Sequence, residues 1–291
     1  MASGWRTVVI NRHEELEMSD NQLIIKSEEQ AWCVPLEQVR DVMVAHPSGS
    51  VSLALLQRLT EDGVNVVLCD RRHEPAAQLI PIGGHLEGAG HLLDQAAWTQ
   101  RRKDALWKQI VRQKITMQAE LLGQAEHAAA KDVGSYASQV RPGDSTNREG
   151  AAAKVYFRAL FGDAFVRHAV DDVNAALNYG YTILNTAVSR AIVSHGYNTA
   201  LGIHHCNRLN YVNLSCDLME PFRPLVDAIV AANADLPLDW PYRQQLIGVL
   251  QCTCRLDGKE YKLGDALDLF ILQAMAFMQG ERKKLGVISF A

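Results

Sequence analysis

The sequence predicts an α+β protein, with a small N-terminal β-rich domain over residues 1–90 and a larger all-α C-terminal domain over residues 91–291. The first ninety residues hold short segments rich in β-branched side chains, separated by polar turns. From His91 onward, apolar residues recur at helical spacing. A group of glycines that includes Gly83 and Gly84 marks the change between the two patterns and predicts a linker.

The β-rich part contains one helical interruption. The strands that precede it are expected at residues 5–10, 23–26, 32–35 and 39–44. Residues 50–62 then carry apolar side chains at helical spacing, and Gly63 follows as a C-terminal stop signal. A buried strand is expected at 64–69 and a last one at 78–82.

The second part begins with one long predicted helix, from about residue 92 to about residue 130. Residues 134–147 contain Gly, Pro, Ser and Asp and are expected to form a loop. Further helices are expected at 147–161, 170–195, 213–233, 240–251 and 263–280. A chain of 291 residues with 48% apolar content is long enough to bury two cores of ordinary size.

The composition favours a cytoplasmic protein. No stretch approaches the roughly 20 uncharged apolar residues of a membrane span. The N-terminus lacks the basic segment and apolar run of a secretory signal. Six cysteines without a disulfide-framework spacing are typical of reduced thiols. We therefore expect no membrane contact.

The net charge of −4 does not favour nucleic-acid binding, so any DNA-binding surface must concentrate its basic groups locally. Two clusters allow this. The first lies in one predicted helix and comprises Arg101, Arg102, Lys103, Lys108, Arg112 and Lys114. The second comprises Arg282, Lys283 and Lys284. A solvated helix face is an equally good interpretation of either cluster taken alone.

Three short stretches, residues 147–150, 202–205 and 217–220, supply side chains that suit one metal site. Two carboxylates and one imidazole are appropriate ligands for Mg²⁺ or Mn²⁺. Arg148 and Arg208 lie beside these stretches and are groups that hold phosphates. A divalent metal next to phosphate-binding side chains indicates phosphodiester chemistry.

Each candidate ligand has a competing interpretation. Glu149 fits a capping box that begins at Thr146, in which it would bond back to the start of a helix. Of His204 and His205, one can bind metal while the other packs or supports it, and the residues do not say which.

Asp217 and Glu220 share one helical face. We expect Glu220 to be a direct ligand and Asp217 to orient His205 or Arg208 from behind. Arg208 could equally form a salt bridge to Asp217 or Glu220. Pro221 predicts a kink or a restart of the helix at that point.

These stretches resemble the motifs of the CRISPR-associated adaptation integrases, the Cas-one family, in its type II branch. Residues 144–157 resemble the first metal motif, residues 202–205 the second and residues 217–224 the third. The opening residues 4–11 resemble the N-terminal strand of that branch. The resemblance implies that Glu149, His205 and Glu220 are the catalytic metal ligands. The third position is Glu here, where some relatives have Asp.

The resemblance implies an integrase and endonuclease that inserts short DNA segments, new spacers, into a CRISPR repeat array. A 3′-hydroxyl would attack a phosphodiester, with Mg²⁺ or Mn²⁺ as cofactor. The expected partners are double-stranded DNA (protospacer and repeat), a second copy bound through the β-rich domain, and a dimer of the Cas-two protein. Two other functions remain open from the residues: a metal-dependent hydrolase of a small substrate, and a DNA-binding scaffold without catalytic activity.

Overall fold

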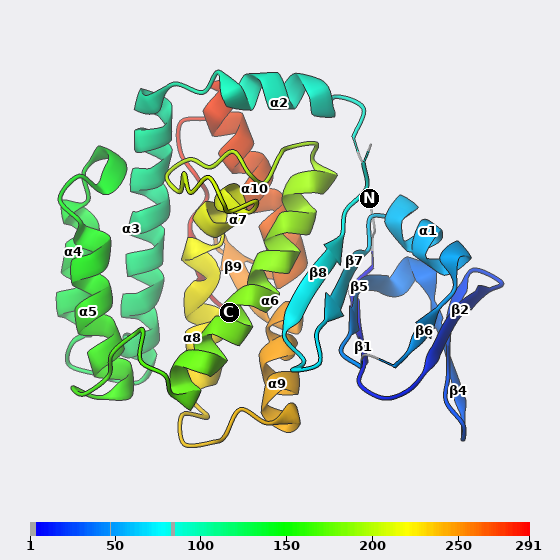
Figure 1. The fold of residues 1–291 in the computed structure, drawn as a ribbon. Coiled ribbons are helices and arrows are strands. Elements are labelled where there is room, and N and C mark those ends of the chain that lie inside the picture. The colour runs from blue at the N-terminus through cyan, green and yellow to red at the C-terminus, as the bar shows by residue number, and fades with distance from the viewer. Residues whose placement is uncertain (1–3, 47, 83–84) are drawn as a thin grey trace. The chain divides into compact units, whose positions relative to one another are not determined.

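The computed structural model describes residues 4–46, 48–82 and 85–291, and the chain forms two compact units (Figure 1). The first unit ends at Ala89 and also includes Val193–Tyr197, and the second comprises Gly90–Ile192 and Asn198–Ala291. The predicted class, a β-rich N-terminal region followed by a mostly helical one, is confirmed. The predicted linker glycines Gly83 and Gly84 lie outside the described residues.

The first unit is built from two four-stranded sheets. One has the order β1 (Arg6–Ile10), β5 (Val39–Val44), β7 (Asn65–Cys69) and β8 (Pro75–Leu79), with only β8 antiparallel to its neighbour. The other has the order β4 (Ala31–Pro35), β3 (Gln22–Lys26), β2 (Glu15–Ser19) and β6 (Ser50–Val51). Side chains from both sheets form one core, among them Ile10, Val42, Leu16 and Leu23.

Alternation of buried and more exposed side chains accounts for β3, whereas β5 is buried along most of its length. In β3, Leu23 and Ile25 are buried while their neighbours are more exposed, as a period of two requires. Strand β2 was not predicted, because Leu16 is its only buried residue and three of its other residues are Glu or Ser. Helix α1 (Leu53–Glu61) begins later than predicted, because Ser50–Val51 pairs with β2 instead.

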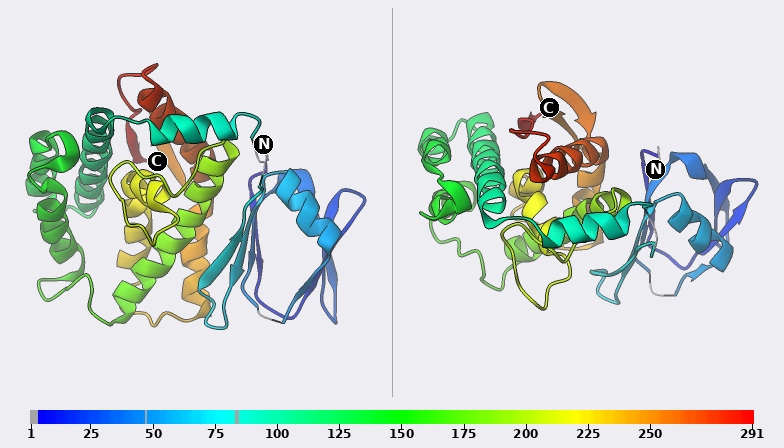
Figure 2. Two further views of the ribbon diagram at one scale, coloured as in Figure 1. Left: turned by 45° about the horizontal axis from the view of Figure 1, so that its top comes forward. Right: turned by 90° about the horizontal axis from the view of Figure 1, so that it is seen from above.

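The long helix predicted for residues 92–130 is two helices, α2 (Gly88–Ala96) and α3 (Gln100–Gln124). The segment predicted as a loop contains α4 (Ala130–Gln139), which packs along α3 (Figures 1 and 2). A Cβ on Gly134 would lie 3.4 Å from the Cβ of Ala119. Gly134 therefore marks a close approach of two helices, where the sequence alone suggested a helix breaker.

The remaining helices follow the predicted order. They are α5 (Arg148–Phe161), α6 (Asp172–Ser194), α7 (Asn213–Leu218), α8 (Arg223–Ala231), α9 (Trp240–Ile247) and α10 (Leu263–Gln279). The segment predicted as one helix over 213–233 is interrupted by a 3₁₀ turn at Glu220–Phe222, which contains Pro221 as expected. No helix in the described part of the chain is long and apolar enough to span a bilayer.

The second unit also holds a three-stranded antiparallel sheet, which the sequence did not predict. Its order is β10 (Lys259–Lys262), β9 (Thr253–Leu256) and β11 (Ile288–Phe290). Asp257 and Gly258, both at positive φ, join β9 to β10, and this dipeptide is the local signal for such a hairpin. Side chains of α3 bond the backbone of the last segment, because Gln113 accepts from Ile288 and Glu120 from Phe290.

Candidate active site

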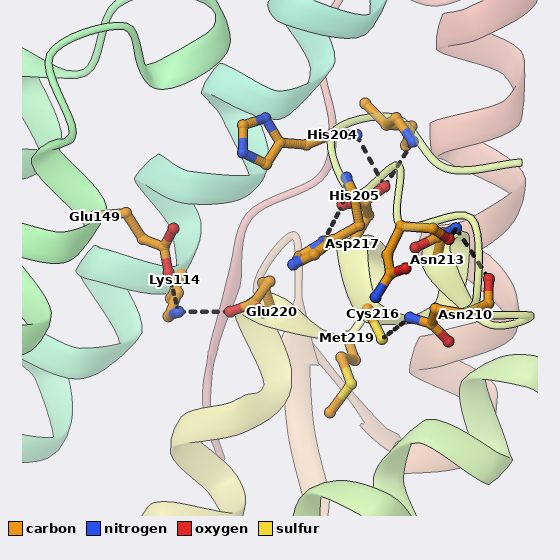
Figure 3. A network of polar contacts seen from close by, with 12 residues as sticks. Lys114, Glu149, His204, His205, Asn210, Asn213, Cys216, Asp217, Met219 and Glu220 are labelled. Carbon is orange, nitrogen blue, oxygen red and sulfur yellow. Dashed lines mark hydrogen bonds and ion pairs between the residues drawn. The ribbon is translucent and has the colours of Figure 1, made fainter. Parts of the chain in front are cut away.

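The three sequence motifs meet beside the middle of α3, and the buried carboxylate of Asp217 organises the loop that carries the histidines (Figure 3). Its two oxygens accept the backbone N–H groups of Ile203 at 2.5 Å, His204 at 3.0 Å and His205 at 3.0 Å. The same carboxylate lies 2.6 Å from Nδ1 of His205. One side chain thus satisfies three successive amides and fixes one imidazole ring.

The loop has no freedom to accept a larger residue at Gly202. A Cβ there would lie 2.2 Å from the carbonyl oxygen of His205, which is closer than any real contact. Asn213, at the start of α7, is buried and donates to loop carbonyl oxygens. These belong to Ala200 at 3.1 Å, Asn207 at 2.9 Å and Asn210 at 3.0 Å. The position of the histidines is therefore set by buried polar groups on α7.

The two histidines point in different directions. His204 stacks on Trp107 of α3, with ring centroids 4.3 Å apart and planes 1° from parallel. His205 turns toward Glu220 and lies edge-on to Trp107 at 6.0 Å (Figure 3). Since Asp217 holds Nδ1 of His205, its Nε2 is the nitrogen left to bind a ligand, the usual arrangement of a histidine supported by a carboxylate. Trp107 was not among the candidates from the sequence.

The hydrogen bond that the His205 ring makes to the carboxylate of Asp217 is the main cause that raises the pKa of His205 above its ordinary value of 6.5. Burial acts in the opposite direction, and the charges of Asp217 and Glu220 add to the rise. The protonated ring is consequently favoured in the folded protein. Its contribution to stability is fully present below pH 6.5 and is lost as the pH rises through the higher pKa of the folded state.

The capping box predicted for Glu149 does not form. Asn147 caps α5, since its side chain accepts from the N–H of Gly150 at 3.2 Å. Asp144 accepts the N–H groups of Arg148 and Glu149, each at 2.9 Å. With the end of the helix satisfied by these residues, the carboxylate of Glu149 is free to turn toward α3.

Lys114 joins Glu149 to Glu220. Its Nζ lies 2.5 Å from Oε1 of Glu149 and 2.5 Å from Oε2 of Glu220 (Figure 3). Burial alone would lower the pKa of Lys114, but the two carboxylates raise it above its ordinary value, so the ammonium stays charged. The sequence groups Lys114 with the basic residues of a candidate DNA-binding surface, but Lys114 does not belong to such a surface because it is only 8% exposed. Its seven-residue spacing from Trp107 on the buried face of α3 was the available signal.

Arg223 is a second cation that the sequence reading missed, although it follows Glu220 by three residues. Its Nε lies 2.9 Å from Oε1 of Glu220. The charges of Arg223 and Lys114 outweigh the effect of burial and lower the pKa of Glu220 below its ordinary value. Glu220 is therefore ionised although it is buried.

Aromatic residues hold Arg223 from behind. Its guanidinium lies over the ring of Tyr181, 4.4 Å from the centroid. The hydroxyls of Tyr181 and Tyr156 both donate to the buried Asp227. Burial raises the pKa of Asp227 to about 6, against the effect of these two hydrogen bonds. The network thus extends from Asp227 through Tyr181 and the partly exposed Arg223 to the candidate ligand Glu220.

The donor set fits a divalent cation in its chemistry, with two carboxylates and one imidazole. Oε2 of Glu220 is buried and has no hydrogen-bond donor, because its contact with Lys114 lacks hydrogen-bond geometry. Within the described residues, however, no three acidic, His or Cys side chains lie close enough together to hold a metal.

The predicted DNA-binding residues have different surroundings. Arg208 is exposed in the loop that follows the histidines. Arg148 is half-buried, and its Nε donates to Thr146 at 3.3 Å. Arg101 and Arg102 are exposed at the start of α3, but Arg102 also donates to the carbonyl oxygen of Met278 at 2.5 Å. Lys103 is half-buried at the same end of the helix.

The structure brings parts of the two basic clusters together. A groove of about 630 Å³ is lined by Lys108 and Arg112 of α3 and by Lys283 and Lys284 near the C-terminus. Apolar side chains, including Leu285 and Ile288, line it as well. By helical rotation, Lys108 and Arg112 project from a different side of α3 than Trp107 and Lys114 do. The groove is thus separate from the cluster around Glu220.

Comparisons with known proteins agree on one family. A family model described as CRISPR associated protein Cas1 matches residues 7–235, which include all three motifs. The CRISPR-associated endonuclease Cas1 of Neisseria meningitidis serogroup C (strain 8013) is 37% identical over 286 residues, 96% of this chain and 94% of the relative. The CRISPR-associated endonuclease Cas1 2 of Pyrobaculum aerophilum is 32% identical over 227 residues, 73% of this chain and 77% of the relative.

Solved structures share the fold at lower sequence identity. A Cas1 protein from Thermotoga maritima has a TM-score of 0.77 at 16% identity, over 97% of this chain and 99% of that one. A casposase bound to an integration product has a TM-score of 0.71 at 18% identity, over 96% of this chain and 92% of that one. A Cas6-RT-Cas1–Cas2 complex has a TM-score of 0.71 at 18% identity, over 97% of this chain and 36% of that one.

Replacing Asp217 with Asn should lower the pKa of His205 in the metal-free protein, because the largest cause of its rise is removed. NMR titration of the His205 ring measures this as a shift of the midpoint to lower pH. Glu220→Gln is the matched control and should give a smaller shift, since Glu220 acts on His205 through charge alone. An unchanged midpoint in a folded Asp217→Asn protein would contradict the role assigned to that carboxylate.

Proposed function

The chain belongs to the Cas1 family, and from that premise we propose that it is a metal-dependent DNA integrase and endonuclease of CRISPR adaptation. It would insert short DNA segments into a repeat array. The observation that carries this proposal is the pair of carboxylates, Glu149 and Glu220, joined by the ammonium of Lys114, with the ring of His205 turned toward Glu220. Sites of this composition suit phosphodiester chemistry.

The proposed reaction exchanges one phosphodiester for another. The 3′-hydroxyl oxygen of the incoming segment forms a bond to a phosphorus of the repeat, and the bond from that phosphorus to the repeat's own 3′-oxygen breaks. The attacking hydroxyl loses a proton and the departing oxygen gains one. Water in place of the incoming 3′-hydroxyl would give strand cleavage, so one site accounts for integrase and endonuclease activity.

Glu149, Glu220 and His205 would hold Mg²⁺ or Mn²⁺. The ion, when bound, polarises the phosphoryl oxygen and stabilises the charge on the departing oxygen. Asp217 keeps Nδ1 of His205 engaged, so that the ring presents Nε2 to the site. Arg223 holds one oxygen of Glu220 and fixes the direction of the other.

Double-stranded DNA, protospacer and repeat, is the proposed substrate, and a Cas2 dimer is a proposed partner. Two solved structures that share the fold support this, since one is a casposase bound to an integration product and the other a complex containing Cas1 and Cas2. The groove of Lys108, Arg112, Lys283 and Lys284 supplies a basic surface despite the net charge of −4. We assign it to the phosphate backbone of the DNA.

Glu149→Ala, His205→Ala and Glu220→Ala should each reduce strand transfer by on the order of 10²–10³, because each removes one of three ligands. The assay combines purified protein, Mn²⁺, a short duplex and a supercoiled plasmid carrying a repeat, with and without Cas2. His204→Ala is the matched control and should lose less, since its ring packs on Trp107. Near-normal integration by any of the three variants would remove that residue from the ligand set.

DNA affinity should fall steeply as the salt concentration rises, and the basic residues of the groove should account for part of that dependence. The double variant Lys108→Glu with Arg112→Glu should flatten the slope of log affinity against log salt by about 2, because two phosphate contacts are lost. Exposed lysines on other surfaces provide the control, Lys131→Glu with Lys259→Glu.

The double variant Arg101→Glu with Lys103→Glu tests, by the same salt slope, whether the start of α3 contacts DNA. It leaves Arg102 in place, because Arg102 donates to the carbonyl oxygen of Met278. A slope that matches the control would show that the substituted residues do not contact phosphate.

We further propose a two-fold dimer formed through the β-rich unit. Among the described residues, strand β4 lies at the edge of its sheet, and its Trp32 is 40% exposed. Trp5 of the same unit is also exposed, whereas Ile10 is buried in the core and Val8 packs against it.

The protein without metal or DNA should therefore sediment as a dimer at micromolar concentration, and Trp32→Glu should dissociate it. Leu209→Glu, at an exposed apolar residue of the second unit, should not. A monomeric wild-type protein would contradict the proposal.

A further inference from the structure

The ammonium of Lys114 lies at the point that a metal would need. It is 2.5 Å from one oxygen of Glu149 and 2.5 Å from one oxygen of Glu220. A Mg²⁺ ion bound by the same two oxygens would lie roughly 2.0–2.1 Å from each. Two cations cannot share that position, so the ammonium has to leave before a metal can bind both carboxylates.

Lys114 forms an ion pair with each glutamate, but only one of these two contacts has the geometry of a hydrogen bond. Its contact with Glu149 is a hydrogen bond, whereas Oε2 of Glu220 has no hydrogen-bond donor. An ammonium on a flexible stem of four carbons can move out without any change in the backbone. Without Lys114, however, Glu149 and Glu220 would face each other as like charges in a partly buried site.

We propose that Lys114 is an internal substitute for the catalytic metal. In the metal-free protein it neutralises Glu149 and Glu220 and keeps them in place, and the metal binds by displacing it. The inference rests on the proposed function, since it assumes a metal at these carboxylates. In this proposal Lys114 positions the two carboxylates. It also competes with the metal for them, and so sets the concentration of divalent metal needed to fill the site.

The test compares wild-type protein with Lys114→Met, which keeps the length of the side chain and removes its charge. Mn²⁺ affinity is measured by calorimetry without DNA, and the midpoint of thermal unfolding is measured with and without Mn²⁺. Lys114→Met should bind Mn²⁺ at least about tenfold more tightly, because no competitor remains and two carboxylate charges are uncompensated. Its metal-free form should melt at a lower temperature than the wild type, and Mn²⁺ should raise that temperature more.

Lys108→Met is the matched control, because Lys108 is on the same helix but lines the basic groove. It should leave Mn²⁺ affinity unchanged. If the wild type binds Mn²⁺ and Lys114→Met binds it equally or more weakly, the inference is overturned and the proposed function stands. If neither protein binds Mn²⁺, the metal-dependent function itself fails.

A second measurement uses the unsubstituted protein, in case Lys114→Met does not fold. The side-chain ammonium resonance of Lys114 is assigned by its absence in Lys114→Arg and is followed by NMR while Mg²⁺ is added. Displacement predicts that this resonance moves as the site fills, while that of Lys108 does not. A resonance that stays in place at saturating Mg²⁺ would overturn the inference.

Discussion

The geometry of the candidate site depends on one buried carboxylate. Asp217 binds three consecutive backbone amides and one imidazole nitrogen, and it is inaccessible to solvent. A buried charge of this kind is stable only because each of its oxygens is satisfied by donors. The histidine loop cannot move without leaving that charge unpaired. Gly202 completes the constraint, because any side chain there would collide with the carbonyl of His205.

Alternating charges organise the other half of the site. Lys114 lies between two glutamates, and Arg223 contacts the oxygen of Glu220 that Lys114 does not. The ring of Tyr181 lies against Arg223, and its hydroxyl donates to Asp227. In such a cluster each ionised group lowers the cost of burying its neighbours. Lys114 and Arg223 thereby offset the charge of the buried Glu220 and hold its two oxygens in place. Under the proposed function, the same contacts would keep the glutamates in position for a metal.

The basic groove and this cluster lie on different sides of one helix, α3. Residues of α3 that face Glu149 and Glu220 are buried, and those that face the C-terminal segment line the groove with Lys283 and Lys284. A protein with a net charge of −4 thereby presents a local basic surface. Glutamines of the same helix bond the backbone next to β11, so α3 supports the site, the groove and the small sheet together.

The sequence by itself determined the α+β class, the order of the helices, the interruption at Pro221 and the three motifs, because these are encoded in local periodicity and residue type. Only the tertiary structure decided which residues surround the glutamates. Lys114 lies thirty-five residues before Glu149, so its helical spacing from Trp107 could indicate burial but not the carboxylates that it contacts. The break before α3, helix α4 in the expected loop and the different orientations of His204 and His205 were likewise decided by packing. Burial and side-chain direction depend on which segments, distant in the sequence, pack against each other, and these contacts form only in the folded protein.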